Sequence, residues 1–441
     1  MKRREFLGVS AGLAGTLLPV LRANARPCPP PTLSVAGGGS TTTTCPSGSA
    51  PAWFEALPDR AWTKIASASG RRLVDVGPQP PLTIEGRTLD SIITSWTGAC
   101  VDQTRGELLM AANGGHAAYA GNECYILRIR SDTPRWHRLN DPTPASHVII
   151  EPASGPAQYA DGRMRSVHNW NRMQFHNGKV WHPSQDAYYS PTHSVAAVWS
   201  FNRDSLGDDA AGWPAPWRDD KGPWTSHGLV GIGSASFIGG PSALDRVGNK
   251  IWSFPEANGG SFPYWSVDTR TGAIQTFTGT GPNPHFGGQW AIVAHDLRIL
   301  VVSDQNSSNV FVMDLTNPQA GVTARPTSGG QSGLTWFGGV YHERSKAILT
   351  YEVTKLGGGN IRKLKIPTRS DGKYDPAGSF EWSTISPAGG GVVPTVERQD
   401  YAGTYSKFNI VEDMGNGQSC LVLVTGIADF TYVYKVPSFG V

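Results

Sequence analysis

At positions 98–112 the sequence reads Gly-Ala-Cys-Val-Asp-Gln-Thr-Arg-Gly-Glu-Leu-Leu-Met-Ala-Ala. A short strand that runs into a turn ending in glycine, followed by an apolar strand, predicts a β-hairpin. The same pattern recurs at 242–254, 290–303 and 338–351, and in a looser form at 171–182 and 405–425. Six copies of one hairpin predict an all-β protein built from repeats.

Each hairpin is followed by a third apolar segment, and in four repeats by a fourth segment with an aromatic residue. The third segments are 124–129, 197–201, 264–267, 310–314, 361–366 and 432–436, and the fourth contain Trp136, Trp224, Phe277 and Trp382. Four antiparallel strands per repeat, with no helical crossover, are typical of a β-propeller blade. We therefore predict six blades over residues 59–441, with a seventh blade within 140–235 as the alternative.

The last repeat ends after its third strand, and a segment near the N-terminus has the properties of the missing one. Residues 60–65, Arg-Ala-Trp-Thr-Lys-Ile, resemble the other fourth strands because they also centre on a tryptophan. We predict that they pair with 431–436, which would close the ring and remove an open edge. Small residues such as Gly98 and Gly338 in the first strands fit this prediction, since first strands converge on the central axis.

The repeats resemble the Kelch-like family, whose propellers include the central domain of galactose oxidase. The resemblance rests on Asn113-Gly114-Gly115-His116 after a second strand, on the third strand 122–127 and on Trp136 in the fourth. The copper-radical chemistry of galactose oxidase needs a Tyr crosslinked to Cys, a second Tyr and two His, and no such set matches here. His168 and His176 would lie roughly 27 Å apart on one extended strand. We therefore predict no metal site, and no cofactor is assigned.

The N-terminal segment is that of an exported protein. Arg3-Arg4 followed by Phe6-Leu7, an apolar run and Ala23-Asn24-Ala25 resembles a twin-arginine signal peptide over residues 1–25, with an ordinary secretory signal as the alternative. Residues 26–58 are rich in Pro, Gly and Thr and predict a linker. The expected location is periplasmic or secreted. The apolar run is too short to span a membrane, so we expect no membrane insertion after signal removal.

The charge balance limits the partners. The net charge of +3 arises within residues 1–25, and the remainder carries 34 basic and 34 acidic side chains. Near-neutrality argues against nucleic acid as a partner. The 15 Trp, 13 Tyr and 15 Phe offer many flat apolar surfaces. A polar small molecule or a glycan is therefore the expected partner.

The cysteines and turn acids are expected to be structural. Cys28 and Cys45 are placed to close a small loop in an oxidising compartment. Cys100 and Cys124 fall on first and third strands, roughly 9.6 Å apart, which exceeds the reach of a disulfide. They and Cys420 are predicted to be buried thiols. Acids that recur beside the hairpin turns are predicted to cap those turns: Asp102, Asp245, Asp296 and Glu343.

Candidate site residues lie in connections that open on one mouth of the channel. Those with acid, base or charge-neutralising chemistry are His116, Tyr119, His168 and Arg172. Those suited to stacking or hydrogen bonding with a ligand are Asn122, Asn169, Trp170, Asn171, Asp186, Gln289 and Trp290. Polar residues in glycine-rich loops also satisfy backbone groups, which is the alternative for His116.

Three functional classes fit this set. The preferred one is recognition of a polar, saccharide ligand at one mouth of the channel, through indole rings beside amide and charged groups. The second is an enzyme of the polysaccharide-lyase type, in which His or Tyr acts as base and acid and Arg neutralises a uronate. The third is a structural or adhesive surface protein. We expect the loop around His116 and the segment 168–172 to converge, because they belong to neighbouring blades and open on the same face.

Overall fold

The computed structural model describes residues 49–84, 87–115, 118–149, 158–190, 193–230, 240–255, 261–280, 286–304, 308–329, 336–415 and 417–437. For residues 184–190, 193–195, 261, 262 and 280 it describes the backbone alone. The expected signal peptide and the pair Cys28 and Cys45 lie outside these ranges.

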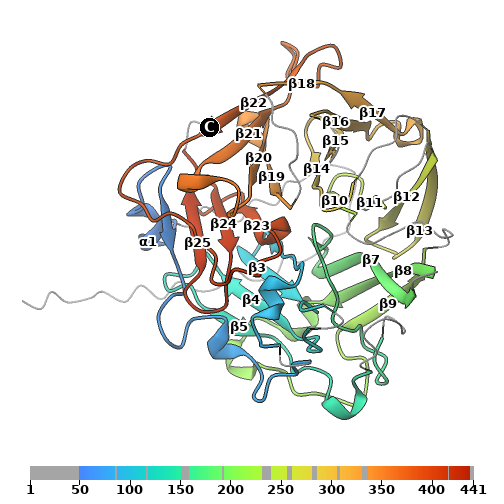
Figure 1. Cartoon of the computed structure of the whole chain (residues 1–441), viewed down its shortest axis with the longest axis vertical. Coiled ribbons are helices and arrows are strands. Elements are labelled where there is room, and N and C mark those ends of the chain that lie inside the picture. Colours follow the sequence, from blue (N-terminus) through green and yellow to red (C-terminus); the bar gives the residue numbers. More distant parts are fainter. Residues whose placement is uncertain are drawn as a thin grey trace, which may run out of the picture. The chain divides into compact units, whose positions relative to one another are not determined.

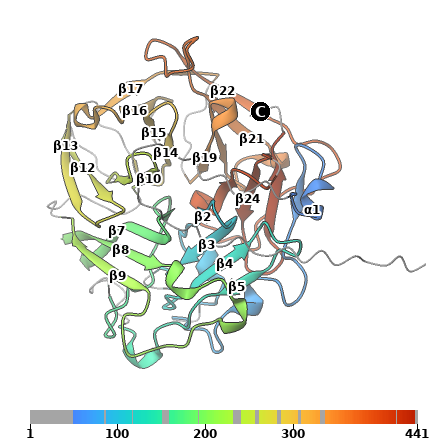
Figure 2. The ribbon, with the colours of Figure 1, turned by 180° about the vertical axis from the view of Figure 1, so that it is seen from behind.

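Six sheets, each with four antiparallel strands, are arranged around a central axis, so the protein is a six-bladed β-propeller (Figure 1). The view from behind shows the same closed ring (Figure 2). The strands of blades 1 to 3 are β2 (Cys100–Asp102), β3 (Glu107–Ala111), β4 (Cys124–Arg128), β5 (Trp136–Arg138); β6 (Gln174–His176), β7 (Lys179–Ser190), β8 (His193–Asn202), β9 (Trp224–Leu229); and β10 (Ser242–Asp245), β11 (Lys250–Ser253), β12 (Ser261–Asp268), β13 (Ile274–Thr280).

Blades 4 to 6 follow the same order from the axis outward. Their strands are β14 (Ala291–Ala294), β15 (Ile299–Ser303), β16 (Val310–Asp314), β17 (Val322–Arg325); β19 (Gly338–His342), β20 (Ala347–Tyr351), β21 (Ile361–Lys365), β22 (Phe380–Ile385); and β23 (Phe408–Val411), β24 (Cys420–Val424), β25 (Thr431–Lys435), β1 (Trp62–Lys64). Blade 5 has a fifth strand that was not predicted, β18 (Thr327–Ser328), which pairs in parallel with β22.

Helical structure in the described residues is short and lies in the connections. The α-helices are α1 (Ala52–Glu55) and α2 (Ser91–Thr94). The 3-10 helices are η1 (Val74–Val76), η2 (Ala145–His147), η3 (Asp204–Leu206), η4 (Ala210–Gly212), η5 (Pro318–Ala320), η6 (Glu343–Ser345), η7 (Gly357–Gly359) and η8 (Tyr405–Lys407). None of the described helices is long and apolar enough to cross a membrane.

The ring is closed by the predicted pairing of an N-terminal strand. Strand β1 pairs with β25, with Trp62 opposite Tyr434 and Lys64 opposite Tyr432. The Trp62 indole is almost fully buried, and its N–H donates to the Gly359 carbonyl at 2.8 Å. The closed ring is therefore stabilised both by the pairing of β1 with β25 and by the buried Trp62 side chain. Phe54 of α1 is buried as well, so residues just before 59 also pack on the propeller.

The core lies between adjacent sheets, as expected when sheets pack face to face. Blades 1 and 2 share a buried layer that includes Leu109 and Trp199. Blades 4 and 5 share one that includes Val301 and Ile348, and each of the other neighbouring pairs has its own layer. The propeller is thus held together by six apolar layers that surround a central channel.

Two of the four turn acids, and the three described thiols, have the predicted structural roles. Asp102 Oδ1 accepts hydrogen bonds from the Thr104 and Arg105 amides, and Asp245 Oδ1 accepts one from the Gly248 amide. Asp296 instead binds Tyr341 and Lys346 of the next blade. The thiols of Cys100, Cys124 and Cys420 are free and buried.

Candidate functional site

The two ends of the channel differ in the connections that surround them. Because neighbouring strands of a blade are antiparallel, the segment that leads into the first strand lies at the same end as the connection between the second and third strands. We call this end the loop face. The opposite end, with the turns between first and second strands, is the hairpin face.

A left-handed residue precedes the innermost strand in five blades. These lead-in residues are Trp96 (φ 50°), Trp170 (φ 42°), Gly288 (φ 65°), Trp336 (φ 74°) and Tyr405 (φ 45°). A positive φ is rare for bulky side chains, because the Cβ atom approaches the backbone. Four aromatic residues in this conformation at one end of the channel therefore need an explanation.

Backbone hydrogen bonds between the lead-in residues account for their left-handed conformation, but they do not account for the choice of aromatic residues at these positions. The Trp170 amide donates to the Trp96 carbonyl at 2.8 Å, and the Trp336 amide donates to the Gly288 carbonyl at 2.9 Å. The Tyr405 amide donates to the Trp336 carbonyl at 3.1 Å. Gly288 shows that glycine meets this backbone requirement. An aromatic residue at the other positions therefore points to a role for its side chain, since strained residues cluster at functional sites.

Two of the lead-in tryptophans are exposed to solvent at the loop face. Trp96 is 43% exposed and Trp336 is 41% exposed, whereas Trp170 and Tyr405 are buried. Most other tryptophans in the described residues are buried in the layers between blades. Trp96 and Trp336 therefore each present an exposed indole at the loop face of a channel that is lined by both polar and apolar residues.

His168 lies in the segment that leads into blade 2 and contacts Trp96, which leads into blade 1. Its imidazole packs edge-on against Trp96, with ring centroids 5.1 Å apart, and lies 5.3 Å from the Trp170 ring. Its Nδ1 lies 2.6 Å from the Ser95 carbonyl oxygen. A Cβ atom on Gly115 would lie 2.2 Å from His168 Cε1, so only glycine allows this approach. The connection after β3 and the segment leading into β6 therefore meet, as expected for neighbouring blades.

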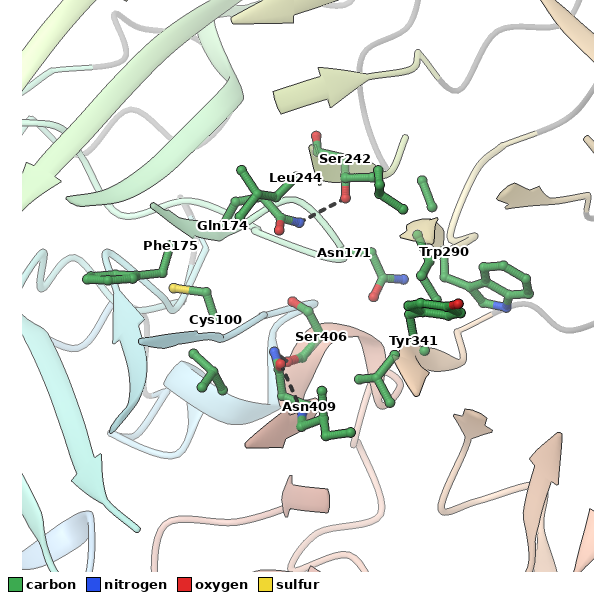
Figure 3. A pocket seen from close by; sticks show the side chains of 18 of the residues that line it. Cys100, Asn171, Gln174, Phe175, Ser242, Leu244, Trp290, Tyr341, Ser406 and Asn409 are labelled. Atoms are coloured by element: carbon green, nitrogen blue, oxygen red, sulfur yellow. Dashed lines mark hydrogen bonds between the residues drawn. The ribbon is translucent and has the colours of Figure 1, made fainter. Parts of the chain in front are cut away.

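Three predicted ligand-binding residues lie where the channel reaches the loop face. The side-chain Nδ2 of Asn171 donates to the Gln289 carbonyl at 2.8 Å and to the Phe337 carbonyl at 3.2 Å. It therefore bridges blade 2 to blades 4 and 5. Trp290 is 1% exposed, and the Gln289 side chain accepts a hydrogen bond from Ser303. Asn171 and Trp290 both line the channel (Figure 3).

The channel itself is small. Its cavity of about 120 Å³ is lined by innermost strands of all six blades, including Cys100, Gln174, Ser242 and Asn409 (Figure 3). Such a volume holds several water molecules but is below the ~300 Å³ at which pockets for organic ligands begin. A ligand of saccharide size would therefore lie over the end of the channel and not within it.

The remaining described candidates are held within the scaffold. The Tyr119 hydroxyl is buried and donates to Glu123 Oε1 at 2.5 Å, where it meets the Tyr125 hydroxyl. Burial raises the pKa of Tyr119 well above its usual range. The Arg172 guanidinium is fully buried, donates to the Gly240 carbonyl at 2.9 Å and lies over the Trp170 ring.

The other two candidate asparagines, Asn122 and Asn169, are also buried and bind neighbouring backbone and side-chain groups. Asn122 Nδ2 donates to the Met164 carbonyl and to the Thr143 hydroxyl, both at 2.9 Å. Asn169 donates to the Ala111 carbonyl and contacts His182, whose Nδ1 lies 3.0 Å from Asn169 Oδ1. His116 lies outside the described residues, as does the side chain of Asp186.

Sequence reasoning missed Trp96, Trp336 and Lys355. The Lys355 ammonium lies 5.1 Å from the centroid of the Trp336 ring and 5.8 Å from that of Phe337. Partial burial lowers the pKa of Lys355. A signal was present in the sequence: a tryptophan stands two residues before a first-strand glycine in both Trp96-Thr97-Gly98 and Trp336-Phe337-Gly338.

A buried lysine lies beneath the loop face. Lys407 of η8 donates to the Ile93 carbonyl at 2.9 Å and to the Thr97 carbonyl at 3.3 Å, and its ammonium lies 4.6 Å from the Tyr401 ring centroid. Burial lowers the pKa of Lys407 to about 7. Lys407 therefore ties blade 6 to the segment that leads into blade 1. Within the described ranges, no group of three or more His, Cys, Asp or Glu is arranged to hold a metal ion.

No protein-family model and no curated protein matches the chain. Among solved structures, it is similar to the structure of YjhT, at 11% identity over 80% of this chain and 95% of that chain, with a TM-score of 0.42. It is also similar to the α-L-arabinofuranosidase Arb93A from Fusarium graminearum in complex with an iminosugar inhibitor, at 8% identity over 85% and 97%, with a TM-score of 0.40. Hydrazine synthase of Kuenenia stuttgartiensis matches at 9% identity over 80% and 99%, with a TM-score of 0.39. These similarities are too weak to indicate a function.

Proposed function

We propose that the protein is an exported Kelch-like propeller that recognises a polar saccharide at its loop face. The observation that carries this proposal is the exposure of Trp96 and Trp336, at 43% and 41%, around one end of the channel. Exposed indole rings beside the mouth of a channel offer flat apolar surfaces on which a ligand can pack. The left-handed backbone at both residues adds to this argument, because glycine would fit there with less strain.

The chemistry of this surface suits a sugar ring. A pyranose has an apolar face of C–H groups that packs on an indole, while its hydroxyls need polar partners at the rim. The His168 imidazole beside Trp96 and the Lys355 ammonium over Trp336 are polar groups of this kind. The small channel beneath them agrees with a ligand that lies across the loop face.

A glycan array probed with the full chain tests the proposal. We expect binding to saccharides that is weakened about tenfold by Trp336→Ala, a loss typical of one aromatic contact. Val247→Ala is a matched control, because Val247 is 63% exposed but lies in a turn of the hairpin face. If the wild type binds no glycan on the array, the proposal is wrong and a structural or adhesive surface protein becomes the better hypothesis.

A polysaccharide lyase is the second candidate, and the orientation of His168 favours it. When Nδ1 donates its proton to the Ser95 carbonyl, a neutral His168 carries its lone pair on Nε2, as a general base requires. In β-elimination, the base removes the proton beside the uronate carboxyl group, the bond to the glycosidic oxygen breaks as a C=C bond forms, and the leaving oxygen takes up a proton from an acid side chain or from water. His168→Ala should then abolish formation of the unsaturated product, whereas under the binding proposal it only weakens the affinity for the glycan.

Export is proposed from the N-terminal sequence. Arg3 and Arg4 should be needed for transport of the folded protein to the periplasm or the medium. Replacing both by lysine keeps the charge, so a general secretory signal would tolerate the change. Unaltered levels of exported protein in the Arg3→Lys, Arg4→Lys variant would therefore contradict the twin-arginine route.

A further inference from the structure

The two ends of the channel are closed in different ways. At the loop face the blades are joined by hydrogen bonds to backbone groups. The Asn171 side chain, which is buried, links blade 2 to blades 4 and 5 through two backbone carbonyls. The Ser406 hydroxyl accepts a hydrogen bond from the Ala99 amide at 3.1 Å and donates to the Trp170 carbonyl at 3.0 Å, so it links blade 6 to blades 1 and 2. Opening this end would therefore require backbone segments of several blades to separate.

At the hairpin face a pair of charged side chains lies across the channel. Arg246 Nη1 lies 2.7 and 2.8 Å from the two carboxylate oxygens of Glu412, and both residues line the cavity. They belong to blades 3 and 6, which face each other across the ring. Both side chains are partly exposed. Because exposed ion pairs gain little over hydration, this contact breaks at a small cost in free energy.

The backbone on both sides of the pair is anchored, so only the two side chains need to move. Gln103 Oε1 accepts a hydrogen bond from the Glu412 amide at 2.9 Å, and Gln103 Nε2 donates to a carbonyl of β23 at 2.7 Å, which holds the turn of blade 6 on blade 1. Asp245, beside Arg246, is bound by the Arg298 guanidinium of blade 4 at 2.6 and 3.0 Å. Rotation of a partly exposed side chain on such a backbone is fast and needs no unfolding.

The space between the two ends is polar and small. The wall of the cavity includes Gln174, Ser242 and Asn409 (Figure 3). Its volume of about 120 Å³ has room for about four water molecules. Solutes of a few non-hydrogen atoms are therefore the largest that it admits.

From these observations we infer that the channel exchanges water and small solutes through the hairpin face, and that the Arg246–Glu412 pair is its gate. When the pair is formed, the guanidinium and the carboxylate lie across the opening. When the two side chains rotate apart, the cavity is continuous with solvent. High salt favours the open state, because ions screen an exposed pair. The gate lies at the opposite end of the channel from the proposed saccharide contact, so either can fail without the other.

The rate at which a thiol in the channel is modified tests the gate. Asn409→Cys in the full chain places a thiol on the channel wall, and methyl methanethiosulfonate is a small neutral reagent. The thiolate attacks the reagent, which forms a mixed disulfide and releases methanesulfinate. Peptide mass spectrometry assigns the adduct to position 409, apart from the native cysteines. In this background Glu412→Gln and Arg246→Met should each speed the modification about fivefold at low salt, as expected for the loss of one exposed ion pair.

Asp429→Asn is the matched control. It breaks the ion pair of Asp429 with Lys64 at 2.9 Å, whose side chains are 45% and 33% exposed, nearly as in the gate pair. This pair belongs to β1 and the turn before β25, at the outer edge of blade 6. We expect no change in the rate for this variant. Salt at about 1 M should speed the modification when Glu412 is present and have no effect after Glu412→Gln.

Three outcomes would overturn the gate. Equal rates with and without Glu412→Gln would show that the pair does not control access. Equal acceleration by Asp429→Asn would mean that the thiol reports a general loosening of blade 6. Fluorescein maleimide is far larger than the cavity, so its attachment at position 409 in any folded variant would show that the thiol faces bulk solvent. None of these rates depends on glycan binding, so a negative glycan array leaves the gate in place.

Discussion

Arg246 and Glu412 form an ion pair across the channel. Arg246 Nη1 lies 2.7 Å from Oε1 and 2.8 Å from Oε2 of Glu412. Arg246 belongs to the first turn of blade 3 and Glu412 to that of blade 6, so the pair joins opposite sides of the ring at the hairpin face. With 35% and 45% of the two side chains exposed, the pair is accessible to solvent.

Glu412→Gln should lower the free energy of unfolding only slightly. We expect a loss below about 1 kcal/mol in urea denaturation at low salt, because exposed ion pairs gain little over hydration, and a smaller loss at high salt. A double-mutant cycle with Arg246→Met isolates the pair. A coupling of several kcal/mol would show that the pair is a major determinant of ring closure.

Trp96→Gly should leave stability nearly unchanged. The left-handed backbone at position 96 costs roughly 1–2 kcal/mol for residues other than glycine, and the substitution removes this cost. The gain offsets two losses: the greater conformational freedom of glycine in the unfolded chain, and the ring contact with His168. We expect the unfolding free energy to stay within about 1 kcal/mol of wild type while saccharide binding on the glycan array falls. Destabilisation beyond ~3 kcal/mol would mean that the indole serves the core.

Gly115→Ala should be more harmful than Gly70→Ala. Both glycines have similar left-handed angles, φ 74° and 77°, but a Cβ atom on Gly70 meets nothing within 4 Å. At Gly115 the new atom collides with His168, whose ring is held by Ser95 and Trp96. We expect Gly115→Ala to cost at least about 1 kcal/mol more than Gly70→Ala in urea denaturation, and to weaken saccharide binding. Equal costs would contradict the close contact.

The pKa of Lys407 predicts a pH dependence of stability. In the unfolded chain this lysine keeps its proton up to its ordinary pKa of 10.5, whereas in the folded protein it loses the proton at about 7. Between these values the unfolded state binds more protons, so the lysine's contribution makes stability rise with pH. Thermal melts from pH 6 to 9 should show a smaller rise for Lys407→Met than for wild type. Parallel curves would indicate that the ammonium stays charged in the fold.

Trp62→Ala should destabilise the propeller strongly. The indole is 1% exposed, binds the Gly359 carbonyl and packs on Tyr351 and Tyr434 with centroids 5.3 and 5.2 Å away. Large-to-small changes at such sites cost about 3–5 kcal/mol. Trp96→Ala removes the same side chain from an exposed position and serves as the control. A loss below about 1 kcal/mol at Trp62 would show that the closing strand contributes little.

The blades were predictable because the relevant signals are local. Turns such as 102–106 and 245–249 repeat with the flanking strands, and a closing strand at Trp62 follows from counting three strands in the last repeat. The fifth strand β18 was not predictable in this way. Its two residues pair in parallel with β22, a contact that depends on how the chain returns in space.

The site was predicted less completely, because burial is not visible in a loop sequence. Tyr119 stands among glycines, as an accessible residue would, yet it is buried with Glu123 and Tyr125 in the layer between blades 6 and 1. Trp96 and Trp336 share the spacing Trp-x-Gly, but this spacing reveals neither their exposure nor their left-handed backbone. The lead-in segment at His168 was found, because its polar and aromatic residues are denser than a first strand needs.

The pairing of β1 with β25 also determines when the ring can close during synthesis. Among the described strands, β1 leaves the ribosome first, and its partner is the last to be made. Blade 6 therefore stays incomplete until translation has passed Lys435, and its unpaired strand edges remain open to association with other chains until then. Chains released before Lys435 would lack the partner of β1, so their closing strand would have no ladder to join.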